Sequence, residues 1–247
     1  KKPRIALVYD RLVTAFGGAE VVMRALTELY PTAPLYTSVY NNQGKAHFSP
    51  KTTLRASFLQ RFSSMAKSKL LSAPFSPFAI ESLDLSEFDI VISVSSSFAK
   101  GVLTKPNQMH LCYLLTPTRY LYSHQNEYEQ HSALNTIFTR PLVNLCKHYM
   151  SIWDQAAAMR PDYIVPISQL VSIRVKKFYL RQPLQPLYPP MALTLSTEEQ
   201  KKLPNIKLPY FLSVSRLVGY KRVDLSIRAC IKLKKNLIVA GEGEEWQ

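Results

Sequence analysis

The stretch from Tyr210 to Asp224 most strongly constrains the fold of this chain, because it combines an apolar run, a basic loop and the start of a helix. Phe211 to Ser215 is typical of a short strand, and apolar residues then recur at helical spacing, at Val223, Ile227, Cys230 and Ile231. The loop between them carries Arg216, Lys221 and Arg222. Backbone N–H groups and the positive end of a helix dipole face such a loop, which favours a diphosphate site. A solvated basic turn is the simpler alternative.

Length and charge limit the possible classes of protein. The chain has 247 residues, of which 47% are hydrophobic, so it can form one or two globular domains. Its formal net charge of +14 indicates an anionic partner. Phosphate-bearing ligands, anionic lipid and nucleic acid all satisfy that requirement, and charge alone does not choose between them.

Three cysteines, Cys112, Cys146 and Cys230, stand far apart among apolar neighbours. Such spacing indicates buried reduced thiols instead of a disulfide framework or a metal site, which favours a cytoplasmic protein. The apolar run at Ile5 to Tyr9 is too short for a signal peptide, and no uncharged apolar run reaches the roughly 20 residues that cross a bilayer. Any membrane association is therefore expected to be peripheral.

The chain opens with the pattern of an α/β domain. A strand at Ile5 to Tyr9 leads through Gly17 and Gly18 into a helix that Pro31 ends. Two glycines at a helix start allow a ligand to approach the backbone closely, although a tight turn explains them equally well. A second strand is expected from Leu35 to Tyr40.

Between Leu29 and Ile80 the chain has no acidic residue, while basic and apolar residues alternate through it. The cations are Lys45, Lys51, Arg55, Arg61, Lys67 and Lys69, and the apolar residues include Leu54, Phe58, Leu59, Phe62, Met65, Leu70, Leu71 and Phe75. This mixture suits an anionic membrane surface. A helical face over the core with snorkelling lysines is the alternative, and no nucleic-acid motif accompanies the segment.

Further strands are expected at Asp89 to Val94, Met109 to Leu115 and Tyr163 to Ile167. The first two run into polar segments that contain Lys100 and Arg119, at the strand ends where open α/β sheets place ligands. A long helix is expected from Arg140 to Pro161, and Ser168 is expected to cap another.

Four prolines between Arg181 and Pro190 predict a stiff boundary, so we expect an N-terminal domain at residues 1–182 and a second domain at 183–247. After this boundary the sequence predicts only two strands, the second at Leu237 to Ala240, and one helix. Two strands and one helix cannot enclose a core. The second domain is therefore expected to be incomplete.

Taken together, several short motifs resemble family 4 of the retaining glycosyltransferases, especially its bacterial mannosyltransferase branch. They occur in the family's order along the whole chain: Gly17–Glu20, Phe98–Gly101, Thr116–Tyr122, Trp153–Ala158, Arg160–Tyr163, Tyr188–Pro190, Ser215–Leu217, Tyr220–Asp224 and Ala240–Gly243.

The resemblance implies a GT-B architecture of two Rossmann-like domains, the second truncated here, and a metal-independent reaction without a cofactor. Arg216 and Lys221 match the family's catalytic pair that holds the donor diphosphate, and preorganised cations would stabilise the charge on the leaving group. The donor site would also include Gly17, Gly18 and Gly241, and the acceptor side would include Lys100, Arg119 and Tyr120. The expected donor is GDP-mannose, or else a UDP-sugar, and the acceptor a lipid-linked glycan or polysaccharide.

An alternative from another class is a non-catalytic GT-B-like protein that binds an anionic lipid or glycan. Leu115 favours it, because the family commonly has a histidine there, and so does the short second domain. No nucleic-acid partner is expected.

Overall fold

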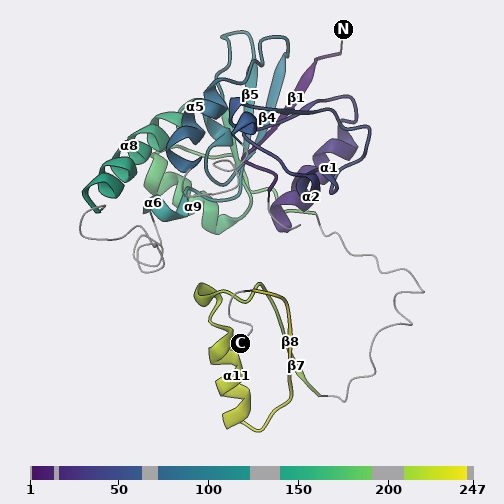
Figure 1. The fold of residues 1–247 in the computed structure, drawn as a ribbon, viewed down its shortest axis with the longest axis vertical. Coiled ribbons are helices and arrows are strands. Elements are labelled where there is room, and N and C mark those ends of the chain that lie inside the picture. The colour runs from purple at the N-terminus through teal and green to yellow at the C-terminus, as the bar shows by residue number, and fades with distance from the viewer. Residues whose placement is uncertain (1, 14–16, 63–71, 123–139, 191–208, 244–247) are drawn as a thin grey trace. The chain divides into compact units, whose positions relative to one another are not determined.

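The computed structural model describes residues 2–13, 17–62, 72–122, 140–190 and 209–243, and it places them in two compact units (Figure 1). The units divide between Ala192 and Leu193, and each is described by itself.

The N-terminal unit is built on a six-stranded parallel sheet in the order β3-β2-β1-β4-β5-β6. Its strands are β1 (Ile5–Tyr9), β2 (Leu35–Thr37), β3 (Leu54–Ala56), β4 (Ile90–Ser95), β5 (Met109–Leu114) and β6 (Tyr163–Pro166). The chain adds strands outward from β1 in one direction and then returns to add β4 on the other side. This is the order of a Rossmann-like doubly wound sheet, in which ligands bind beyond the carboxyl ends of the strands where the order reverses, here β1 and β4.

Helices cover both faces of the sheet because successive residues of each strand point to opposite faces. Leu7 and Tyr9 pack against α1, while Ala6 and Val8 pack on the opposite face with Ile80 of α5. Figure 1 shows α1 on one side of the sheet and α8 and α9 on the other. The helices are α1 (Gly18–Leu29), α2 (Asn42–Lys45), α5 (Ser76–Glu81), α6 (Arg119–Tyr122), α8 (Arg140–Ala158) and α9 (Gln169–Tyr179), with 3₁₀ turns η1 (Phe58–Arg61), η2 (Ala73–Phe75) and η3 (Ala99–Gly101).

The expected strands are present, with differences at their ends. The strand expected from Leu35 to Tyr40 ends at Thr37, and Tyr40 keeps only an isolated bridge to Leu12. The short edge strand β3 was not predicted, because three residues carry no recognisable alternation and Arg55 stands in the middle.

The boundary between the units lies later than residue 182. Leu184 N–H donates to Ile164 O at 2.9 Å, and Leu187 N–H donates to Pro166 O at 3.0 Å. These bonds hold the proline-rich segment against β6, so it belongs to the N-terminal unit up to Ala192.

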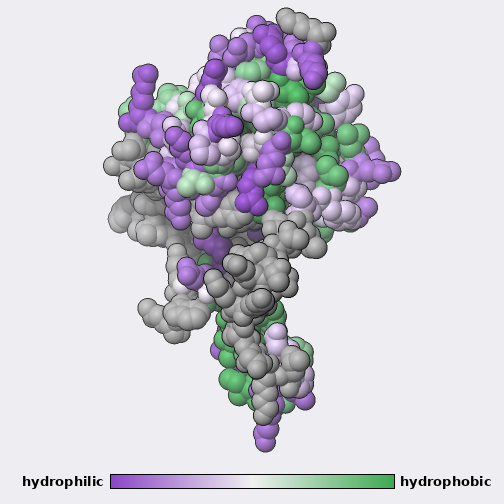
Figure 2. All heavy atoms as spheres, turned by 90° about the vertical axis from the view of Figure 1, so that its right-hand side faces the viewer, coloured by the Kyte–Doolittle hydropathy of each residue, from purple (hydrophilic) through white to green (hydrophobic). Residues whose placement is uncertain are grey.

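The C-terminal unit consists of one β-α-β arrangement: β7 (Phe211–Val214), η4 (Gly219–Lys221), α11 (Val223–Lys232) and β8 (Leu237–Ala240). The two strands pair in parallel, with Phe211 opposite Leu237. Apolar side chains of the strands and of the helix are exposed, and green spheres mark hydrophobic residues of this unit in Figure 2. They include Phe211, Leu212, Val214, Leu225, Ile231 and Leu233.

All three cysteines are free thiols. Only Cys112 is fully buried, whereas Cys146 and Cys230 are partly exposed, so the expectation of three buried thiols was wrong for two of them. Within the described ranges, no helix is long and apolar enough to cross a bilayer.

Candidate functional site

The basic loop of the C-terminal unit lies between β7 and α11, and the side chains of Arg216 and Lys221 are exposed on it. Ser215 N–H donates to Ala240 O at 3.1 Å, and Leu217 N–H donates to Glu242 O at 2.9 Å. The two neighbours of Arg216 thus form backbone hydrogen bonds to the last residue of β8 and to the segment that follows it. The sequence prediction of a strand, a basic loop and a helix is confirmed.

Gly241 has a structural reason to be glycine. Its φ angle is +151°, and a Cβ at this position would collide with the carbonyl oxygen of Ser215. Gly243 meets the carbonyl oxygen of Leu217 in the same way. The two glycines therefore allow the segment after β8 to pair with the basic loop, and a donor contact by Gly241 stays a prediction.

Arg222 has a different position from Arg216 and Lys221. It stands at the N-cap of α11 in the left-handed region, with φ of 49°, and binds Asp224 through both carboxylate oxygens, at 2.9 and 3.0 Å. This hydrogen bonding lowers the pKa of Asp224. Since Asp224 balances the charge of Arg222, we leave Arg222 out of the candidate anion-binding pair.

The glycine turn of the N-terminal unit is fixed by Glu20. Gly17 N–H donates to Glu20 Oε2 at 3.0 Å, and the Tyr9 hydroxyl donates to Glu20 Oε1 at 2.8 Å. Burial and the Glu20 carboxylate raise the pKa of Tyr9 well above its usual value, so the phenol remains a donor. A Cβ on Gly18 would have no atom within 4 Å among the described residues, so the turn leaves open space there.

Asp10 occupies the switch point of the sheet, and sequence analysis did not single it out. Its buried carboxylate accepts hydrogen bonds from the backbone N–H groups of Ser96, Ser97, Phe98 and Ala99, at 2.6 to 3.0 Å. The hydroxyls of Ser95 and Ser96 donate to it as well. The loop after β4 is therefore wrapped around this carboxylate. An acidic residue directly after an apolar strand was the only signal available in the sequence.

Lys100 is buried, with 1% of its side chain exposed, and does not present its ammonium to solvent. Nζ lies 2.5 Å from Asp154 Oδ1 and also donates to the carbonyl oxygen of Ser97. The rings of Trp153 and Tyr179 lie on its sides, with centroids 6.0 and 5.7 Å from Nζ. This geometry does not support direct contact between Lys100 and an acceptor. Arg119 is exposed and Tyr120 half-buried, on the short helix α6.

Asp154 accepts three more hydrogen bonds, all from hydroxyl groups. Thr118 donates to Oδ1 at 2.6 Å, while Tyr122 and Tyr179 donate to Oδ2 at 3.1 and 2.8 Å. Burial and the neighbouring carboxylate raise the pKa of both tyrosines, which keeps them protonated. We call Lys100, Thr118, Tyr122, Asp154 and Tyr179 the Asp154 cluster. Its members come from widely separated sequence motifs.

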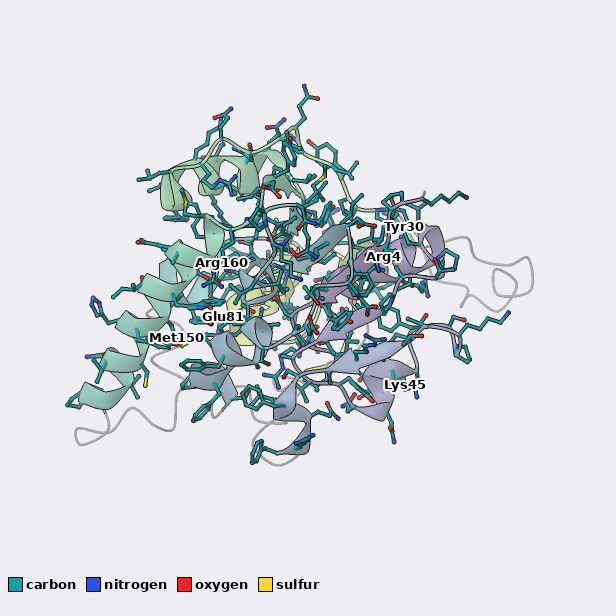
Figure 3. All side chains as sticks on the ribbon, turned by 90° about the horizontal axis from the view of Figure 1, so that it is seen from above. Arg4, Tyr30, Lys45, Glu81, Met150 and Arg160 are labelled. Atoms are coloured by element: carbon teal, nitrogen blue, oxygen red, sulfur yellow. The ribbon has the colours of Figure 1, made fainter. Side chains whose placement is uncertain are left out.

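A second set of contacts joins the same motifs. A Cβ on Gly101 would lie 2.5 Å from the Trp153 ring, so glycine allows that ring to pack on the backbone. Trp153 Nε1 donates to Glu81 Oε1 at 2.7 Å, and Arg160 binds the same oxygen at 2.7 Å. Glu81 at the end of α5 and Arg160 just after α8 are labelled in Figure 3. The motifs at residues 98–101, 116–122, 153–158 and 160–163 therefore meet in one packed region of the N-terminal unit.

At the carboxyl end of β5, Leu115 packs with the apolar cluster under α1. The next residue, Thr116, accepts a hydrogen bond from Arg174 Nη1 of α9 at 3.2 Å. Arg174 was not predicted as a site residue, because its helical spacing gave no sign that it reaches the sheet edge. At this edge the structure brings together the end of β5 and the middle of α9.

Comparison with known proteins gives no family for this chain: no protein-family model matches it, and no curated protein matches it significantly. In the described part of the chain, no group of histidine, cysteine, aspartate and glutamate side chains is arranged to hold a metal ion. The site is thus defined by its own geometry, in an α/β chain whose N-terminal unit has a Rossmann-like parallel sheet.

Proposed function

We propose that the chain is a retaining glycosyltransferase of GT-B architecture that transfers a hexose, with GDP-mannose as the favoured donor, to a lipid-linked or polysaccharide acceptor. The observation that carries the proposal is the exposed pair Arg216 and Lys221 in a loop that leads into the N-terminus of α11. A diphosphate bound there would meet two cations and the positive end of the α11 dipole.

The chemistry requires no protein nucleophile in this proposal. The bond between the sugar and the donor diphosphate breaks, negative charge grows on the leaving oxygens, and Arg216 and Lys221 stabilise that charge. Arginine offers a planar fork of donors for phosphate oxygens, whereas lysine offers a mobile point charge. The acceptor hydroxyl attacks the sugar carbon from the face that the leaving group departs from, and its proton goes to the departing phosphate oxygen.

Isothermal titration of GDP, UDP and GDP-mannose into the whole chain tests the donor site. Arg216→Ala and Lys221→Ala should each weaken GDP binding by about tenfold or more, since a hydrogen bond to a charged group contributes about 1.5–3 kcal/mol. Lys232→Ala is the matched control, because it removes a cation from the last turn of the same helix.

The base that binds more tightly identifies the class of donor. If neither nucleotide binds, or if Lys232→Ala weakens binding as much as the other two variants, the donor site is refuted. The non-catalytic binding protein would then be the better account of the chain.

For the acceptor side, we propose peripheral binding to an anionic membrane surface. Four phenylalanines of adjoining elements are 40–55% exposed, namely Phe58, Phe62, Phe75 and Phe78. Both η1 and η2 contact α5, so the elements that carry Phe58, Phe75 and Phe78 adjoin one another, and η1 also carries the exposed Arg61. Aromatic insertion and charge attraction add together on such a surface. Met65, Lys67, Lys69, Leu70 and Leu71, which were part of the prediction, lie outside the described residues.

Co-sedimentation with phosphatidylserine-containing vesicles tests this surface. The double variant Phe75→Ser/Phe78→Ser should reduce bound protein several-fold, whereas Leu170→Ser/Ile173→Ser on α9 should not, although those two residues are 56% and 62% exposed. Equal losses in both double variants would contradict the proposed surface.

A further inference from the structure

We propose that Asp154, together with Lys100, is a positioning residue that holds the acceptor segment, residues 118–122, at the carboxyl edge of the sheet. The role of that segment in acceptor binding rests on the proposed function. Its attachment to Asp154 rests on the geometry of the Asp154 cluster alone.

The cluster joins the loops that follow two adjacent strands. Lys100 follows β4, whereas Thr118 and Tyr122 follow β5 and stand on either side of Arg119 and Tyr120. Each of the three binds the Asp154 carboxylate. The segment that carries the expected acceptor residues is therefore attached to the same carboxylate at both of its ends.

Helix α6 needs such an attachment. It has four residues, which is far below the length at which a helix is stable by itself in water. Its packing partners therefore decide where Arg119 and Tyr120 lie. Because Leu121 is buried, α6 has an apolar contact on its inner side, and the hydrogen bonds to Asp154 fix it beside that contact.

Lys100 supplies the positive charge that the buried Asp154 carboxylate requires. With 2% of its side chain exposed, Asp154 is removed from solvent, and a buried carboxylate requires a countercharge and a full set of donors. The Lys100 ammonium supplies the charge and, through the carbonyl oxygen of Ser97, also ties the loop around Asp10 to the cluster. Lys100 thus affects acceptor binding indirectly, by balancing the charge of the Asp154 carboxylate that holds the acceptor segment.

Thr118→Val and Tyr122→Phe each detach one end of the acceptor segment from Asp154. Tyr113→Phe is the control, because its hydroxyl donates to the carbonyl oxygen of Leu187 at 2.7 Å and does not belong to the Asp154 cluster. The measurement is hydrogen exchange of the peptide that covers residues 116–122, in the whole chain.

We expect exchange of this peptide to become roughly fivefold faster in Thr118→Val and Tyr122→Phe, the factor that loss of one hydrogen bond allows, and unchanged in Tyr113→Phe. Equal acceleration in all three variants would show that the cluster only stabilises the fold. No acceleration in any of them would show that the segment does not depend on Asp154. Either result overturns the proposal.

The second readout is transfer from GDP-mannose to a polyprenyl-diphosphate-linked sugar as the probe acceptor. Thr118→Val and Tyr122→Phe should raise the KM for this acceptor roughly fivefold and leave the Kd for GDP unchanged, whereas Tyr113→Phe should change neither. An unchanged acceptor KM in an active enzyme overturns the positioning role. If the wild-type chain transfers no sugar, the proposed function fails while the exchange experiment still decides whether Asp154 positions the segment.

Discussion

His110 Nε2 lies 2.8 Å from the Ser93 hydroxyl inside the parallel sheet, and neither side chain has any exposed surface. Burial lowers the pKa of His110 from 6.5 to about 4, so the ring is neutral in the folded protein. His110 Nδ1 has no hydrogen-bond partner in the described residues. The core therefore contains a titratable group that cannot accept a proton without disruption.

Stability should consequently fall on acidification between about pH 6.5 and pH 4. In this range the unfolded chain binds a proton at His110 and the folded chain does not, so the free energy of unfolding decreases as pH decreases and is fully present only above pH 6.5. The loss should be about 3 kcal/mol. Urea denaturation at pH 7.5 and pH 4.5 measures it.

His110→Gln should reduce that pH dependence, whereas His148→Gln, at an exposed position on α8, should preserve it. The same slope in wild type and His110→Gln would mean that another group causes the acid sensitivity.

Asp10→Asn should be among the most destabilising single substitutions in the N-terminal unit. The amide cannot serve four backbone N–H donors and two hydroxyls as a carboxylate does, and each buried donor left without a partner costs about 1–3 kcal/mol. A loss of roughly 3 kcal/mol or more in thermal or urea unfolding is expected. Asp89→Asn is the control, because Asp89 accepts the Arg4 N–H at an exposed position and should cost less than about 1 kcal/mol.

Gly18→Ala and Gly101→Ala should have opposite effects on stability. At Gly18 a methyl group meets open space and removes backbone freedom from the unfolded chain, so stability should be unchanged or rise by up to about 1 kcal/mol. At Gly101 the methyl group would overlap the Trp153 ring, which Glu81 holds in place, at a cost of about 1–3 kcal/mol.

Circular dichroism melts compare these two variants directly. GDP-mannose titration adds a second test, since weaker binding in a stable Gly18→Ala protein would indicate close approach of the donor to this turn. A destabilised Gly18→Ala would instead indicate that the glycine serves the fold.

Cys112 should be inert to thiol reagents in the folded chain. Burial raises its pKa to about 12, and the thiolate is the reactive form. Ellman's reagent should therefore label Cys146 and Cys230 first and reach the third thiol only in denaturant. Cys112→Ser should remove that late phase. If it instead removes a rapid phase under native conditions, the buried position of Cys112 is wrong.

The strands could be predicted because parallel strands buried on both faces appear as short apolar runs, as at Ile90–Ser95 and Met109–Leu114. The basic loop was predicted for a similar reason, since Arg216 and Lys221 stand between an apolar run typical of a strand and apolar residues at helical spacing. The environment of Lys100 could not be predicted. Its partner Asp154 lies in α8, and the apolar residues at helical spacing there predict a helix but not which residue Asp154 contacts. A buried ion pair is a property of tertiary packing.

The same reasoning explains why Asp10 was missed. A carboxylate at the end of a strand can face solvent, bind a metal ion or accept hydrogen bonds from backbone N–H groups. Asp10 accepts from backbone N–H groups because the loop after β4 lies beside it in the folded chain. Hence the predicted cations Arg119, Arg216 and Lys221 are exposed, whereas the predicted Lys100 and the added Asp10 are buried by contacts that no local pattern indicates.

The hydrogen bond from Leu217 N–H to Glu242 O, beyond the end of β8, has a practical consequence for any shortened version of this chain. A polypeptide that stopped at Ala240 would retain both strands and the helix of the C-terminal unit, yet it would lose the Glu242 carbonyl that binds Leu217. Ser215 would keep its hydrogen bond to Ala240, so the basic loop would be held at its first residue only. Glu242 therefore contributes to the backbone geometry of a loop that lies more than twenty residues before it in the chain.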